Sequence, residues 1–262
     1  MGFAIQLLNH RNKYFLFFVF TLLQSQESID SIVFKMNQHA QPVDIEMEIK
    51  VTLNSKNKKI TKDSHYRLMN HLEKRYEDGK FKSKLLLRFI EPKEVRGLAL
   101  LNWNWIDELK NDQWLYVPRL RKVKRIKPSE SSRKFQGTEF TYGDIIEGDM
   151  EYENYKFFKK DYCFGNECYL LKRDSKNSRI IWVDDGKYLI RKIEYFNKDG
   201  IKIRILEIPE YVKNNSYWTP VKRIMRNLEN GNSTTLEVIK VEYDQGLKDS
   251  SFSEKYLKRL KF

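Results

Sequence analysis

One stretch of alternating residues constrains the fold more than any other part of the sequence. Residues 43–53 read VDIEMEIKVTL, and apolar side chains alternate strictly with polar or charged ones along the whole stretch. Successive side chains of a β-strand point to opposite faces, so this alternation predicts a long antiparallel strand with one face in solvent. An amphipathic helix would instead need apolar residues three and four positions apart.

Further strand patterns follow along the chain. Turn pairs such as Asp185-Gly186 and Asp199-Gly200 fall between them, where tight hairpins need residues that accept positive φ. A series of strands with few helices predicts a mainly β protein, either a sandwich or a wide, curved, barrel-like sheet. The expected strands are 62–75, 81–90, 97–105, 113–117, 151–162, 168–174, 179–183, 188–196, 201–208, 217–227 and 234–243.

Helical patterns are short. Apolar residues at helical spacing predict an amphipathic helix over 28–40 and a C-terminal helix over 252–260, with Ser253 as its cap. Residues 140–146 are expected to form one or two further turns. The helices therefore serve as additions to the sheet rather than as its scaffold.

Three of the expected strands are apolar on both faces: 85–90, 98–103 and 113–117. An antiparallel strand with one face in solvent should alternate, so these strands need cover on both sides. A helix, a second sheet or a ligand would each supply that cover.

The N-terminus resembles a secretory signal. Arg11 and Lys13 precede the uncharged run 14–23, which is too short to span a bilayer as a helix, and a polar segment follows. We expect residues 1–26 to be a signal peptide and 27–262 to be a single domain; a buried element or an uncleaved anchor is the alternative. Export would place the chain in the periplasm of a Gram-negative-type envelope.

The two cysteines support export. Cys163 and Cys168 flank a short segment in which Gly165-Asn166 is a two-residue turn signal, and this turn places the cysteines opposite each other in a hairpin. A disulfide is therefore predicted, as is typical of oxidising compartments. Two free thiols in a cytosolic hairpin are the alternative.

Enzyme and metal motifs are not found in the sequence. The histidines, His10, His39, His65 and His71, have no partners at metal-ligand spacing and are expected on the surface. Since nucleophile, P-loop and dinucleotide motifs are also missing, we expect no catalytic residues, no metal and no cofactor.

The chain is basic, with 49 Lys and Arg against 36 Asp and Glu and a formal net charge of +13, which favours anionic partners. Six of the basic residues lie within 119–127, after Pro118, on an expected bulged strand. Nucleic acid is not the expected partner, because the aromatic residues precede this run instead of alternating with it. Arg121, Lys124 and Arg125 either contact a head group or partner, or form a solvated edge strand whose charges discourage sheet pairing.

Three ordered blocks carry a family resemblance. They are RFIEPKEVRGLALLNW, DQWLYVPRLRKVKRI and RKFQGTEFTYGDI, and they resemble the outer-membrane lipoprotein-sorting proteins of the LolA/LolB-like group. More narrowly, they look like the larger branch associated with resistance–nodulation–division (RND) transporters. The motif residues that carry the resemblance are Pro92, Gly97, Pro118, Gly137, Tyr142 and Asp144.

The resemblance implies a half-open antiparallel β-barrel with helices across its concave face, enclosing an apolar cavity. The N-terminal helix and residues 128–146 would form the lid, and Tyr142 and Asp144 would fix the lid's backbone. The aromatic residues expected in the cavity wall or lid are Trp103, Trp105, Trp114, Tyr116, Phe135 and Phe140.

A non-enzymatic periplasmic carrier is the function that this resemblance implies. It would shield a lipid or an acylated protein during transfer toward the outer membrane, between an inner-membrane RND-type transporter and an outer-membrane or membrane-surface acceptor. The alternative is an adaptor or structural subunit of an envelope transport complex. A carrier should leave room in its apolar interior, whereas an adaptor should fill that interior with its own side chains.

Overall fold

The protein folds around one large antiparallel sheet. A computed structural model describes residues 27–56, 66–106, 111–146, 155–173 and 178–259, so the expected signal peptide lies outside the described residues. The first half of the chain forms β1 (Asp44–Asn54), β2 (Tyr66–Arg75), β3 (Phe81–Glu91), β4 (Ala99–Trp105), β5 (Asp112–Val117) and β6 (Lys122–Ile126). The second half forms β7 (Tyr155–Cys163), β8 (Asn166–Arg173), β9 (Arg179–Asp184), β10 (Ile190–Phe196), β11 (Lys202–Asn214), β12 (Tyr217–Asn227) and β13 (Ser233–Tyr243).

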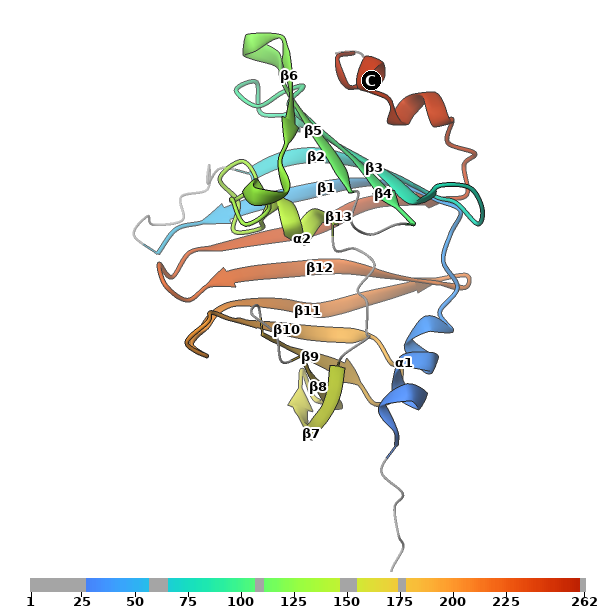
Figure 1. Cartoon of the computed structure of the whole chain (residues 1–262), viewed down its shortest axis with the longest axis vertical. Helices are drawn as coiled ribbons and strands as arrows, with labels where there is room; N and C mark the ends of the chain where they lie inside the picture. Colours follow the sequence, from blue (N-terminus) through green and yellow to red (C-terminus); the bar gives the residue numbers. More distant parts are fainter. Residues whose placement is uncertain (1–26, 57–65, 107–110, 147–154, 174–177, 260–262) are drawn as a thin grey trace, which may run out of the picture.

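The strand order shows two meanders that meet in the middle of the sheet. The 13 strands run β6-β5-β4-β3-β2-β1-β13-β12-β11-β10-β9-β8-β7, so each half pairs its strands consecutively and β1 pairs with β13. Strand β1, with its alternating sequence, is thus central and pairs on both sides, for example Met47 with Val241 and with His71. Among the described strands, β6 and β7 are the two edges of a curved sheet (Figure 1). The prediction of a mainly β fold is confirmed, with the sheet left open.

The helices are few and short: α1 (Ile29–Asn37), α2 (Tyr142–Ile146) and α3 (Glu254–Leu257), with 3-10 turns at η2 (Pro118–Leu120), η3 (Pro128–Glu130) and η4 (Asp249–Phe252). Helix α1 begins at Ile29, close to the expected start. Ser28 caps it, since the Ser28 side chain accepts a hydrogen bond from the Ser31 amide at 3.2 Å. Helical cover of the concave face is not supported, since most of that face has no helix on it. None of the helices in the described residues is long and apolar enough to cross a membrane.

The two faces of β3, β4 and β5 are covered differently. The face that carries Leu87 and Leu100, which we call the inner face, packs in one cluster with Met47 and Phe89. The opposite, outer face packs in another cluster with residues of the C-terminal segment, which we define as 244–259. This segment explains why the three strands are apolar on both sides.

Asp44 directs the C-terminal segment to the outer face. Its buried carboxylate accepts hydrogen bonds from the amides of Gln245, Gly246 and Leu247 at 2.8, 3.0 and 2.9 Å. The chain that leaves β13 therefore turns immediately beside the start of β1. In Figure 1 the segment (red) lies beside β3 and β4, away from α2.

The strand order also requires a long connection. Because β6 and β7 are the opposite edges of the sheet, the chain between them must cross its width. The described part of this connection, 127–146, which we call the crossover segment, lies over the inner face, with α2 in front of β1 and β13 in Figure 1. Its cover of the inner face is mostly irregular backbone instead of helix.

The disulfide is present, but the hairpin that carries it has a different turn from the predicted one. Cys163 and Cys168 are bonded, with their Cα atoms 6.3 Å apart. The two turn residues are Phe164 and Gly165, with φ of 48° and 79°, so Cys163 pairs with Asn166 and Cys168 with Asp161. A tight hairpin of this kind needs positive φ at both central positions, and the prediction placed these positions one residue too late.

Candidate functional site

A cavity of about 430 Å³ lies on the inner face of the sheet. Strands β1 to β3 form one wall and β10 to β13 the other, so the cavity spans the junction of the two meanders. Its volume falls within the range of about 300–1,000 Å³ that is usual for small-molecule sites. The lining combines aliphatic and aromatic side chains with some polar ones, and its aliphatic part includes Met47, Ile49, Leu85, Leu87, Ile193 and Leu206.

One end of the cavity is bordered by the end of α1 and the chain that follows it. Met36 and residues 39–42 line this end, and the His39 ring is within 2.8 Å of the Lys187 carbonyl oxygen. The helix is held in place by Glu27, whose carboxylate accepts hydrogen bonds from the Tyr169 hydroxyl at 2.7 Å and the Tyr188 hydroxyl at 3.1 Å and pairs with Lys35.

The ionisation of Glu27 reflects these contacts. Burial raises its pKa, but the hydrogen bonds from Lys35, Tyr169, Ser31 and Tyr188 outweigh burial and lower the pKa from 4.5 to about 2. Glu27 therefore stays ionised at neutral pH and connects α1 to β8 and to the chain before β10.

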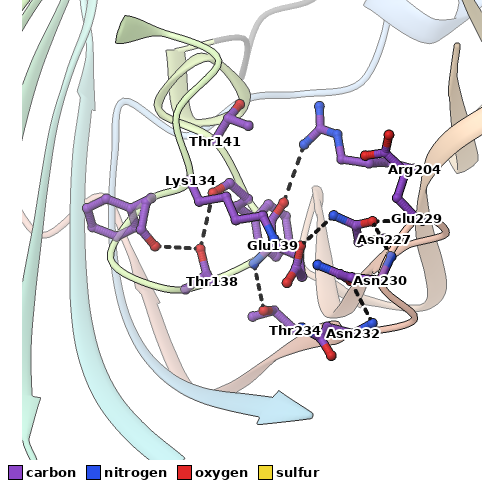
Figure 2. Close-up of polar contacts among 12 residues, drawn as sticks. Lys134, Thr138, Glu139, Thr141, Arg204, Asn227, Glu229, Asn230, Asn232 and Thr234 are labelled. Atoms are coloured by element: carbon purple, nitrogen blue, oxygen red, sulfur yellow. Dashed lines mark hydrogen bonds and ion pairs between the residues drawn. The ribbon is translucent and has the colours of Figure 1, made fainter. Parts of the chain in front are cut away.

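The crossover segment borders the other end and is held by a buried glutamate. Glu139 pairs with Lys134 at 2.6 Å, and its carboxylate accepts a hydrogen bond from the Asn227 side chain at 2.9 Å. Its amide donates to the Thr234 hydroxyl, also at 2.9 Å. Figure 2 shows these contacts converging on Glu139 from β12 and β13. Each buried polar group of Glu139 is thus paired, which fixes the segment over the strand ends.

A second anchor joins α2 to β11. Asp144 accepts hydrogen bonds from both terminal nitrogens of Arg204, at 2.6 and 3.2 Å. Asp144 also caps its own helix, since its carboxylate accepts from the Thr141 amide at 2.7 Å and its amide donates to the Thr141 hydroxyl at 3.1 Å. Burial lowers the pKa of Arg204, but the hydrogen bond and charge of Asp144 outweigh burial and raise this pKa above its usual value.

The cavity wall also carries a charged cluster. Glu73 on β2 lies 3.2 Å from His71 and 3.1 Å from Arg75, and all three side chains line the cavity. Burial raises the pKa of Glu73, but the hydrogen bond with His71 and the charges of Arg75 and Arg223 lower it below its usual value. Arg223 on β12 lines the same cavity.

Comparison with known sequences assigns the chain to a family. A family model described as an uncharacterized protein matches residues 82–259. The chain belongs to that family. No curated protein matches the sequence.

Solved structures show which fold the family has. A domain from Vibrio parahaemolyticus, described provisionally as an outer membrane lipoprotein-sorting protein domain, is 27% identical, with 88% of this chain and 98% of that one covered and a TM-score of 0.76. A DUF1329 family protein from Desulfovibrio piger is 23% identical over 86% of this chain and 96% of its own, also with a TM-score of 0.76. A LolA superfamily protein from Nitrosomonas europaea is 16% identical over 88% of this chain and 100% of its own, with a TM-score of 0.64. The fold is thus that of LolA-like lipoprotein-sorting domains.

In this LolA-like fold, two of the six predicted aromatic residues line the cavity. Phe135 and Phe140 belong to the crossover segment, and both contribute to the lining. Phe135 stacks on Phe89 of β3 with ring centroids 5.8 Å apart, and Tyr142 packs against it edge-on at 5.6 Å. Tyr142 also accepts a hydrogen bond from the Gln113 side chain at its carbonyl oxygen, 3.1 Å away, so its backbone is fixed on β5.

The other four aromatic residues, Trp103, Trp105, Trp114 and Tyr116, lie away from the cavity. Trp103, Trp114 and Tyr116 pack beneath the C-terminal segment, where the Trp103 indole donates to the Phe252 carbonyl oxygen at 2.8 Å. Trp105 donates to Asp112 at 3.1 Å and contacts Phe81. Trp103 and Trp105 share the parity of the outward-facing Leu101 on β4. On β5, Trp114 pairs with Leu101 and Tyr116 with Ala99, so all four point to the outer face, and none is among the lining residues of the cavity.

The proline and glycine residues that carry the family resemblance shape the connections between strands. Gly97 has φ of 80°, and its amide donates to the Phe89 carbonyl oxygen at 2.8 Å, while the Pro92 carbonyl oxygen accepts from Val95 and Arg96. These bonds close the β3–β4 turn.

Gly137 and Pro118 have similar local roles. Gly137 has φ of 79° and follows Gln136, and together they form the turn that brings Phe135 and Phe140 to the cavity. Pro118 begins η2, and its carbonyl oxygen accepts from Arg121 at 3.0 Å.

The predicted basic contact residues lie on the edge strand β6 or, for Arg121, directly before it, and none of them is part of the cavity lining. Arg121, Lys124 and Arg125 are all exposed. Lys124 pairs with Glu130 at 2.7 Å, and Arg125 pairs with Asp112. The Lys124 hydrogen bond, the Lys127 amide and Arg133 lower the pKa of Glu130 to about 2.

The cavity cluster was missed by sequence reasoning. His71 was expected on the surface, but it lines the cavity with a side chain only 12% exposed. The signal was present: positions 69, 71, 73 and 75 share one face of β2, and Met69 on that face is part of the core. Alternation of polar and apolar residues alone would assign these charged residues to a face in solvent, whereas the parity they share with Met69 assigns them to the inward face, where they line the cavity.

Proposed function

We propose that the protein is an extracytoplasmic carrier that shields the acyl chain of a lipid or a lipidated protein. The observation that carries this proposal is the cavity of about 430 Å³ on the mainly apolar inner face. Proteins pack their interiors densely, so apolar space of this size between well-ordered strands indicates a ligand site. The disulfide fits an oxidising compartment, and we place the carrier in the periplasm.

The energetics favour a carrier of this kind. Each buried CH₂ group contributes about 0.8 kcal/mol, so exposing an acyl chain of about 14 carbons to water costs on the order of 11 kcal/mol. That cost prevents unassisted transfer across an aqueous compartment. A cavity lined by aliphatic side chains removes most of it during transit.

Transfer toward the outer membrane, with an RND-type transporter at the inner membrane, is the direction we propose. The similarity to a domain described as an outer membrane lipoprotein-sorting domain supports the direction of transfer, while the transporter remains part of the proposal alone. The exposed Arg121, Lys124 and Arg125, on or directly before β6, would contact anionic head groups of an acceptor membrane or an acidic partner surface. An adaptor that fills its interior with its own side chains is the rival function, and the open cavity favours the carrier.

Filling the cavity tests the proposal. Leu206 on β11 lines the cavity, whereas its neighbour Ile205 does not, so Leu206→Trp and Ile205→Trp form a matched pair on one strand. We expect Leu206→Trp to weaken binding of a fluorescent long-chain fatty acid by about tenfold or more, equivalent to about 1.4 kcal/mol. Ile205→Trp should bind as the wild type does. Equal binding of the fatty acid by both variants would show that the cavity is not the binding site.

A further inference from the structure

Arg223 is an unusual side chain in the wall of an apolar cavity. It projects from β12 into the lining, and its Nε is buried without a hydrogen-bond partner. Within the described part of the chain, no hydrogen bond or ion pair engages its guanidinium group. A buried donor of this kind costs free energy unless something supplies an acceptor.

Other polar groups of the cavity already have partners. The Tyr211 hydroxyl donates to the Ile190 carbonyl oxygen at 2.7 Å, and the Tyr217 hydroxyl donates to Asp244 at 2.7 Å. Ser83 accepts from the Asn104 side chain at 2.8 Å. Arg223 therefore differs from its neighbours, and its missing acceptor is not a general property of the cavity.

The one carboxylate whose charge acts on Arg223 already has closer partners. This carboxylate belongs to Glu73, which lies within 3.1 Å of Arg75 and 3.2 Å of His71. Glu73 therefore acts on Arg223 through its charge alone, without a hydrogen bond or ion pair. Burial lowers the pKa of Arg223, which is the effect expected of a cation whose lost hydration is not fully replaced.

We propose that Arg223 binds the anionic head group of a lipid, a carboxylate or a phosphate, while the acyl chain lies along the aliphatic wall of the cavity. The inference rests on the proposed carrier function and specifies its cargo. A guanidinium group suits this role because its planar donors match the two oxygens of a carboxylate or phosphate. The head group would then enter the cavity instead of remaining in water at its mouth.

This placement favours a free anionic lipid as the cargo over an acylated protein. The acyl chains of a lipidated protein end in ester and amide groups, which are neutral and would leave the guanidinium group without a counter-charge. A fatty acid or a phosphate-bearing lipid supplies both the chain and the charge.

Binding of matched probes tests the proposal in the full chain. Dodecanoate and dodecan-1-ol have equal chain lengths and differ in head-group charge at neutral pH. We expect the wild type to bind dodecanoate at least about tenfold more tightly, as for a charge-assisted hydrogen bond in a buried site. Arg223→Met should lose this preference while its affinity for dodecan-1-ol stays unchanged, and Arg223→Lys should retain part of the preference.

The outcomes separate the two proposals. If neither probe binds the wild type, the carrier function itself fails. If both probes bind the wild type equally, the head-group site is wrong while the carrier function stands, and this comparison needs no variant to fold. Inorganic phosphate serves as a competitor in the last experiment. If phosphate at millimolar concentration does not compete with dodecanoate, the anion that Arg223 binds is a lipid head group. If phosphate alone binds tightly, the ligand of Arg223 is a free anion and the proposal of a lipid is wrong.

Discussion

The two faces of β3 behave differently, although neighbouring leucines occupy them. Leu86 faces outward and packs beneath the C-terminal segment with Phe252 and Leu257. Leu87 faces inward and lines the cavity. The same strand therefore has one face that the chain fills with its own side chains and one face beside which it leaves space.

The two faces differ in whether the chain itself covers them. On the outer face, aromatic residues pack against one another, including Trp103 and Trp114 with ring centroids 4.8 Å apart. The inner face is lined by aliphatic residues and by Met47 and Met69, whose flexible side chains adapt to ligands of varied shape, together with aromatic residues such as Trp218. The difference teaches that aromatic residues alone do not distinguish the ligand face in this fold; what distinguishes the two faces is the C-terminal segment, which fills the outer one.

Truncation of Phe252 should give the largest effect and tests the filled face. Its side chain is 1% exposed beneath the C-terminal segment, so Phe252→Ala should lower the free energy of unfolding by about 3–5 kcal/mol. Phe34→Ala is the matched control, because Phe34 on α1 is 63% exposed and should change stability little. Chemical denaturation measures both. A small loss for Phe252→Ala would mean that the C-terminal segment does not close the outer face.

The neighbouring leucines test the comparison directly. We expect Leu86→Ala to cost about 3–4 kcal/mol because it leaves a new cavity in a packed face. Leu87→Ala should cost about 2–3 kcal/mol, since its side chain already borders open space. Added fatty acid should raise the Tm of both variants by mass action, since both keep the cavity, and the difference in cost between them should remain. Equal costs would show that the two faces are packed alike.

The smallest expected effect concerns the end of the cavity beside α1. The pKa of Glu27 is lowered from 4.5 to about 2, so its contribution to stability is fully present above about pH 4.5 and is lost as the pH falls toward about 2. The Tm of the wild type should therefore fall more steeply across this window than that of Glu27→Gln.

The exposed Asp30 of the same helix provides the control for this pH effect. Asp30→Asn should retain the slope of the wild type, because Asp30 makes no comparable contact with Tyr169 and Tyr188. Identical slopes for all three proteins would mean that Glu27 does not hold α1.

The sequence predicted the sheet well because local patterns determine it. Alternation in 43–53 gave the central strand, and Gly-containing turns gave most strand boundaries. The pairing of β1 with β13 was not predictable in this way, since it joins segments at opposite ends of the chain. That pairing, however, is what brings the two meanders together around the cavity.

The candidate site was harder to predict than the fold. Apolar character on both faces of 113–117 indicated that something covers each face, but not which face the chain itself covers. Trp114 and Tyr116 were therefore expected in the cavity wall, although they lie beneath the C-terminal segment. For the cluster at Glu73, the parity of β2 carried a local signal that it faces inward, but its interaction with Arg223 on β12 is long-range, and no local pattern of residues records such an interaction.

Mass spectrometry of the intact protein tests the central claim most directly. The protein would be purified from the cell envelope and measured under native conditions, before and after extraction with organic solvent. We predict a stoichiometric, non-covalent lipid that the extraction removes. Protein that is empty, and that stays empty after incubation with envelope lipids, would contradict the carrier function and favour the adaptor.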